Sequence, residues 1–159
     1  GFDFFSKQLV VDNLELGEKI PVVPDWFSIT HAQNPGIAFS LDVPHAVIYA
    51  VGVVMLGMLA HTLWTIDRRA RVIAAALAML TAGGLGNIID RIPDGTVTDF
   101  AFFYTNHPTL TPWLKANVGM TAWPVFNIAD VLLIAGVIVF GIHQAIWGDD
   151  EEDEAAAPA

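Results

Sequence analysis

The chain of 159 residues contains no cysteine and little positive charge. The absence of cysteine excludes disulfides, thiolate nucleophiles and cysteine-based metal sites. Lysine and arginine together number 7, and no basic patch with interleaved aromatic residues occurs, so nothing in the sequence suggests nucleic acid as a partner. The G-x-S-x-G elbow and the phosphate-binding loop are also missing. The five histidines show no metal-ligand spacing.

Charged residues make up 15% of the chain and hydrophobic residues 54%, which is too few charges for an ordinary soluble domain. Six of the ten net negative charges lie in an unbroken acidic run at 149–154. Such a run is usually solvated, and the Ala/Pro end that follows it is typical of disorder. We therefore expect one membrane-embedded domain at 1–147 and an acidic, disordered cytoplasmic tail at 148–159.

Three long apolar segments dominate the sequence, at 46–64, 72–89 and 124–147. A helix of nineteen residues is about 28 Å long, close to the apolar thickness of a bilayer. We predict that all three segments span the membrane. The short connection "TIDRRAR" at 65–71 is basic, so the positive-inside rule places it in the cytoplasm. The connection at 91–122 then lies outside.

The segment "DWFSITHAQNPGIAFSL" at 25–41 has a different pattern. Apolar and polar residues alternate from Trp26 to His31, which predicts a strand. A turn follows at 34–36, and "GIAFSL" is expected to form a returning strand. The stretch "TVTDFAFF" at 96–103 is a candidate third strand. We expect a small β-sheet on the outer membrane surface.

Two aspartates lie at the outer ends of apolar segments. Asp130 is near the start of the third segment, where an acid at membrane depth is costly unless a partner or a function compensates. Asp99 follows a turn and is expected at the same outer face. If the two carboxyl groups lie close together, they cannot easily be ionised at the same time, so one retains a proton while the other is charged. This division supports peptide hydrolysis by an activated water. The residues alone leave the pairing open, and stabilisation of Asp130 by the helix dipole is the alternative.

Other polar residues near these acids have either bracing or substrate-binding interpretations. Asp90 and Arg91 end an apolar segment, and Arg91 can brace carboxylates or backbone carbonyls there. Asn34 and Asn87 need partners if buried, and each can brace the backbone or orient a substrate. Asn127 is expected on the same helix face as Asp130. A metal between Asp99 and Asp130 would lack a supporting His/Glu cluster.

Five blocks in order resemble the lipoprotein signal peptidase (signal peptidase II) family of bacteria. They are "DFFSK" at 3–7, "NPGIAFS" at 34–40, "GNIIDR" at 86–91, "VTDF" at 97–100 and "FNIAD" at 126–130. With the segments between them, the resemblance extends over about residues 1–147. The resemblance implies a multi-pass helical bundle of four spans, the first mostly missing here, with a small extracytoplasmic sheet.

The resemblance further implies an aspartyl endopeptidase of the bacterial inner membrane, with its active site at the extracytoplasmic face. It would cut prolipoproteins before a diacylglyceryl-modified cysteine, without a metal or an organic cofactor. We expect contacts with membrane lipid, no nucleic acid, and a monomer. The catalytic pair falls on Asp99 and Asp130, and the supporting residues are Asp3, Lys7, Asn34, Asn87, Arg91 and Asn127.

One departure from the family pattern is the long, polar connection at 104–122, where a compact one is expected. It is interpreted either as a lid over the site or as a passive insertion. Two other functions remain in view: a transporter or proton-relay protein that uses Asp130 as an intramembrane proton carrier, and a non-catalytic assembly protein.

Overall fold

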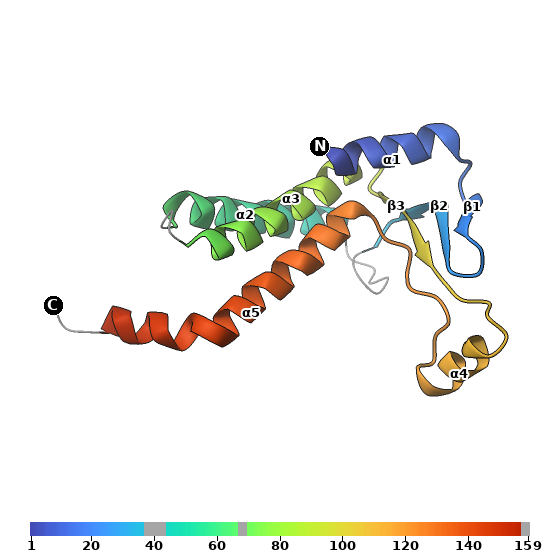
Figure 1. The fold of residues 1–159 in the computed structure, drawn as a ribbon. Coiled ribbons are helices and arrows are strands. Elements are labelled where there is room, and N and C mark those ends of the chain that lie inside the picture. The colour runs from blue at the N-terminus through green and yellow to red at the C-terminus, as the bar shows by residue number, and fades with distance from the viewer. Residues whose placement is uncertain (37–43, 67–69, 157–159) are drawn as a thin grey trace. The chain divides into compact units, whose positions relative to one another are not determined.

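The computed structural model describes residues 1–36, 44–66 and 70–156, which fall into two compact units (Figure 1). The sheet unit contains Gly1–Pro44 and Ile89–Ile128, and the helical unit contains His45–Ile88 and Ala129–Ala159. The elements in order are α1 (Phe2–Asn13), β1 (Lys19–Val23), β2 (Phe27–Asn34), α2 (His45–Thr65), α3 (Arg71–Arg91), β3 (Val97–Phe103), α4 (Leu110–Asn117) and α5 (Ile128–Ala156).

The sheet is antiparallel, with the strand order β1-β2-β3 (Figure 1). It confirms the strand predicted from Trp26 onward and the third strand predicted at 96–103. The predicted returning strand at 36–41 lies almost wholly outside the described residues. Among the described residues the partners of β2 are β3 and β1, a strand that the sequence pattern did not predict.

A β-bulge interrupts the pairing of β2 with β3. Ile29 pairs with Ala101, but Ala32 pairs with Asp99, so two residues of β2 oppose one residue of β3. A bulge of this kind bends the strand and changes the direction in which later side chains point. It sets the register in which Asn34 pairs with Val97 and Ala32 with Asp99.

Helix α1 packs against β2 and β3 within the sheet unit. Its buried residues are Lys7 and Val10, which are three positions apart and therefore share a face of the helix. The exposed apolar residues of α1 lie on its other sides, with Phe2 at 74% exposure. A helix that buries a lysine and exposes phenylalanines is unusual for a water-soluble protein, and this pattern suits an apolar surrounding.

Two described helical stretches are long and apolar enough to cross a membrane, Arg71–Arg91 and Ile128–Trp147. Only 11% of the Ile128–Trp147 window is buried, so the stretch is not the core helix of a soluble domain. The described apolar part of α2, Gly52–Thr65, is shorter than a span. Of the three predicted spans, the described residues therefore show two, and these residues do not show the four spans that the resemblance implies.

The predicted start of the last apolar segment was wrong, whereas its predicted end matches the end of the apolar stretch Ile128–Trp147. Helix α5 begins at Ile128 rather than near Pro124, because the backbone of Phe126 pairs with Ala101 of β3. Helix α5 continues past Trp147 into the acidic run, as far as Ala156. The acidic cytoplasmic tail at 148–159 stays a prediction. Glutamate and alanine are strong helix formers, and proline is absent until residue 158.

Glycines allow close approach of the helices in the helical unit. A Cβ added at Gly83 would lie 2.5 Å from the carbonyl oxygen of Ala129, and one at Gly136 would lie 2.9 Å from the carbonyl oxygen of Ala76. Both contacts join α3 to α5, and the neighbouring backbone cannot move aside cheaply. Small residues are the usual means by which membrane helices pack closely.

We expect Gly83→Ala and Gly136→Ala each to lower the free energy of unfolding by about 1 to 3 kcal/mol, as overpacking does in cores. The measurement is the unfolding midpoint in detergent. Gly141→Ala is the matched control, because a Cβ there meets nothing within 4 Å. Equal midpoints for Gly83→Ala and Gly141→Ala would show that α3 and α5 do not pack as described.

Candidate active site

Asp99 lies on β3, and two asparagine amides hold its carboxylate. Asn127 Nδ2 donates to Oδ1 at 2.7 Å, and Asn34 Nδ2 donates to Oδ2 at 3.1 Å. Asp99 is 3% exposed and Asn127 is 1% exposed. Each carboxylate oxygen thus has a side-chain donor, which satisfies a buried charged group and fixes its orientation.

The amide of Asn34 has a defined orientation. Its Oδ1 accepts the backbone N–H of Gly36 at 3.1 Å, so its Nδ2 is the group that faces Asp99. The carbonyl of Gly36 in turn accepts a hydrogen bond from Arg91 Nη2 at 2.8 Å. Arg91 is buried at the end of α3 and braces the turn that follows β2. This contact agrees with the bracing interpretation of Arg91, with a backbone carbonyl as its partner.

Asp130 lies in the first turn of α5 and has an amide partner of its own. Asn87 Nδ2, from α3, donates to Asp130 Oδ1 at 2.8 Å. The N-terminal end of a helix also favours a negative charge. Asp130 is therefore held by a side chain from a neighbouring helix, as Asp99 is held from two other segments. The prediction that Asn127 shares a helix face with Asp130 was wrong, because α5 begins one residue after Asn127.

A buried ion cluster supports the strand that bears Asp99. Lys7 Nζ is 3.0 Å from Asp3 Oδ2 and 3.3 Å from Asp90 Oδ2, and Lys7 is 1% exposed. Asp90 Oδ2 also accepts the backbone N–H of Thr98 at 2.6 Å. Thr98 immediately precedes Asp99, so the cluster fixes the backbone at that point. Sequence reasoning placed Lys7 and Asp3 at the site only through the family resemblance.

The described residues contain no group of three or more His, Asp or Glu side chains that could hold a metal ion. Among the histidines, His31 is buried, and its Nδ1 donates to the carbonyl of Leu14 at 2.9 Å. That bond joins β2 to the end of α1, so His31 braces the fold. The chemistry that these residues offer is that of carboxylates oriented by amides.

Comparisons with known proteins show which family has this sequence and fold. The sequence profile of the family described as Signal peptidase (SPase) II matches residues 1–146. The chain belongs to the signal peptidase II family. The lipoprotein signal peptidase of Chlorobium luteolum is 33% identical over 159 residues, covering 97% of this chain and 91% of the relative. That of Desulforapulum autotrophicum is 36% identical over 151 residues, covering 89% and 83%.

Solved structures give the same result for the fold. A bacterial membrane enzyme determined by the in meso method at 2.3 Å superposes with a TM-score of 0.74 at 27% identity, covering 99% of this chain and 88% of that one. A second bacterial membrane enzyme, determined at 1.9 Å, gives a TM-score of 0.71 at 28% identity, and the match covers 89% of this chain and 83% of that one. As a member of the signal peptidase II family, this chain is a membrane-bound protease, and the resemblance noted in its sequence is confirmed.

Proposed function

We propose that this chain is an aspartyl endopeptidase that removes the signal peptide from prolipoproteins by cutting before a diacylglyceryl-modified cysteine. The observation that carries the proposal is the contact of Asn127 with Asp99 at 2.7 Å. Asn127 belongs to the same short segment as Asp130, only three residues away in the chain. Three residues of extended chain span about 10 Å at most, which supports a shared role for the two acids.

In the proposed mechanism, one water is activated by Asp99 and Asp130 together. The charged carboxylate takes a proton from the water while the oxygen of the water attacks the scissile carbonyl carbon. The protonated carboxyl group donates its proton to the carbonyl oxygen. The resulting tetrahedral intermediate collapses when the carboxyl group that took the water proton gives it to the amide nitrogen and the C–N bond breaks. One hydroxyl of the intermediate returns its proton to the other carboxylate as it becomes the new carbonyl, so the two carboxyl groups again share one proton. Roles for the individual acids are not separable, since a coupled pair titrates as a unit.

The asparagines explain how the acids keep their geometry during this cycle. Asn34 and Asn127 donate to different oxygens of Asp99, and Asn87 donates to Asp130. These donors fix the carboxylate planes without supplying a full positive charge. A lysine or arginine in direct contact would hold a carboxylate permanently ionised and weaken it as a proton acceptor. We assign Asn34, Asn87, Asn127 and Arg91 to positioning, with Asp3 and Lys7 behind them.

We place the protein in the bacterial inner membrane, as a monomer, with the two acids at the extracytoplasmic face. The substrate's signal helix and acyl chains would remain in the bilayer, so binding its lipid part costs little desolvation. A proton-relay transporter is the second candidate. It is disfavoured by the position of Asp130 in the first turn of α5, at the end of the apolar stretch rather than near its middle.

The proposal is tested with the purified protein in lipid and a synthetic precursor peptide that carries a diacylglyceryl cysteine. Mass spectrometry should find a single cut, immediately before the modified cysteine. The same peptide with an unmodified cysteine is the control and should be cleaved much more slowly, because it lacks the acyl chains that hold it at the membrane. Cleavage elsewhere, or none at all, would contradict the proposal.

A further inference from the structure

Strand β1 covers only part of the edge of β2. It pairs with the residues from Phe27 to Thr30. Just before β1, the backbone of His31 bonds to the chain twice: its N–H donates to the carbonyl of Glu18 at 3.2 Å, and its carbonyl accepts the N–H of Gly17 at 2.7 Å. Gly17 is the last residue of this segment that bonds to β2; its φ of 84° is a backbone conformation that favours glycine, and the chain turns away from the edge there. In the part of the chain that the structure describes, no strand lies along this edge beyond His31.

The backbone of Gln33 faces this uncovered edge. In an antiparallel strand, successive residues direct their N–H and C=O groups to opposite sides. The backbone of His31 bonds toward β1, and Ala32 pairs with Asp99 on the β3 side. The N–H and C=O of Gln33 therefore point away from β3. The side chain of Gln33 is exposed.

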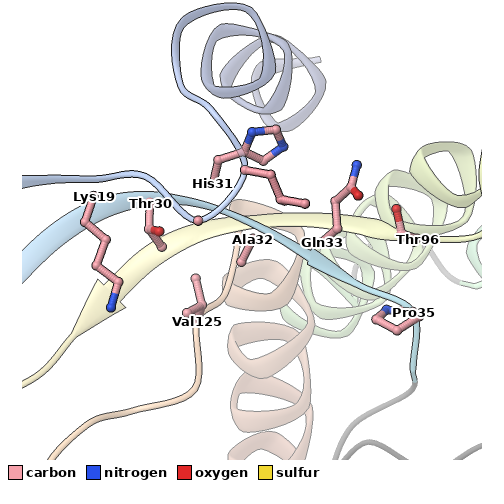
Figure 2. Close-up of a pocket in the computed structure, with 10 residues that line it drawn as sticks. Lys19, Thr30, His31, Ala32, Gln33, Pro35, Thr96 and Val125 are labelled. Carbon is pink, nitrogen blue, oxygen red and sulfur yellow. The ribbon is translucent and has the colours of Figure 1, made fainter.

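A groove of about 540 Å³ runs along this edge (Figure 2). Figure 2 shows the side chains of His31 and Gln33 on one side of β2 and that of Val125 on the other. The lining combines apolar side chains with a few polar groups, among them Lys19, Thr30 and Thr96. An open strand edge inside a groove is the arrangement by which proteins bind an extended peptide as an added strand.

We infer that this groove binds the extended segment of the prolipoprotein that follows the scissile bond, with Gln33 as its backbone partner. The inference rests on the proposed function. Asn34, the next residue after Gln33, contacts Asp99 at 3.1 Å, so the groove begins beside the proposed catalytic acid. A strand advances about 3.3 Å per residue, which places substrate residues about two to four after the modified cysteine in the groove.

The occupant must be the downstream segment for a physical reason. The upstream segment is a signal helix held among lipid chains, and its backbone bonds are satisfied within the helix. The downstream segment is in water, with backbone groups available for pairing. The groove therefore contributes to recognition through main-chain bonds, which tolerate different side chains in different lipoproteins.

The test places the photo-crosslinking residue p-benzoylphenylalanine at Gln33 in an Asp130→Asn background, a substitution that lies outside the sheet unit and should slow cleavage of the precursor. The control carries the same residue at Gln8, which is exposed on α1 and outside the groove. Irradiation with the diacylglyceryl lipopeptide should crosslink position 33 several-fold more than position 8. Mass spectrometry should map the crosslink to about the second to fourth residue after the cysteine. Equal yields, or a crosslink confined to the signal segment, would overturn the inference.

A kinetic measurement on the parent protein provides an independent readout. A backbone N-methyl group about three residues after the cysteine removes one donor and should raise KM about 2- to 10-fold with little change in kcat. The same group about ten residues after the cysteine should change neither. If the unmethylated peptide is not cleaved, the proposed function has failed. If it is cleaved and both methylated peptides behave alike, only the groove has failed.

Discussion

Replacing either Asp99 or Asp130 by asparagine is expected to lower kcat for precursor cleavage by about 10² to 10⁴-fold, the usual contribution of a positioned acid or base. Asparagine has nearly the same shape as aspartate, but it cannot accept the proton that the attacking water must lose. The rate of signal-peptide release from the diacylglyceryl lipopeptide measures the effect. Because the loss is in a transition-state interaction, KM should change much less than kcat.

The matched control for these variants is Asp94→Asn. Asp94 is an exposed carboxylate in the turn before β3, and it accepts hydrogen bonds from the N–H of Thr96 at 2.9 Å and from its hydroxyl at 2.8 Å. These bonds, led by the backbone N–H, lower the pKa of Asp94 below its ordinary value. Both donors reach the same oxygen, Oδ1, which the amide oxygen of asparagine can replace, so we expect unchanged cleavage. Full activity in Asp99→Asn or in Asp130→Asn would refute the two-carboxylate mechanism.

The two variants should differ in stability, which separates chemistry from folding. Asn34 and Asn127 donate to different oxygens of Asp99, and an asparagine at position 99 offers only one acceptor oxygen. Asp99→Asn therefore leaves one buried donor without its partner, whereas an asparagine at position 130 can keep the bond that Asn87 donates to Oδ1. Asp130→Asn should unfold close to the parent, and Asp99→Asn at a lower midpoint.

The sequence alone predicted the elements of the fold that have a periodic or otherwise local residue pattern. The period-two pattern after Trp26 and the stretch around Asp99 predicted β2 and β3, and uncharged length predicted the apolar helices. Strand β1, "KIPVV", gave no such signal, because it is short, contains proline and is exposed at all five residues. Its pairing with β2 depends on tertiary contacts rather than on its own composition.

The site depends on long-range features that a local pattern cannot contain. Asn127 and Asp99 are 28 residues apart in the sequence, and Asn34 and Asp99 are 65 apart. Whether Asn34 can reach Asp99 is set by the bulge in β2, which shifts the register by one residue after Ile29. A shift of one residue sends every later side chain to the other face of the sheet. The motif order could be read from the chain, but the hydrogen bonds that orient the acids could not.

Lys7→Met is expected to lower the free energy of unfolding by about 3 to 5 kcal/mol, the usual effect of removing one partner from a buried ion pair. Lys7 is 1% exposed and is the cation shared by Asp3 and Asp90. Methionine fills a similar volume, so the loss reports the charge rather than a cavity. Lys115→Met, at an exposed site on α4, is the matched control and should fall within about 0.5 kcal/mol of the parent.

The double variant Lys7→Met/Asp90→Asn tests whether the cluster acts through the Asp90 charge. If the cost of Lys7→Met comes from leaving Asp90 buried and unpaired, then removing that charge as well should recover part of the loss, and the two effects will not add. Strict additivity would show that Lys7 and Asp90 do not interact. Because Asp90 also accepts the N–H of Thr98, directly before Asp99, cleavage by the single variant Lys7→Met should fall even at temperatures where the protein stays folded. Normal cleavage by the folded variant would mean that the ion cluster supports the fold and leaves the position of Asp99 unaffected.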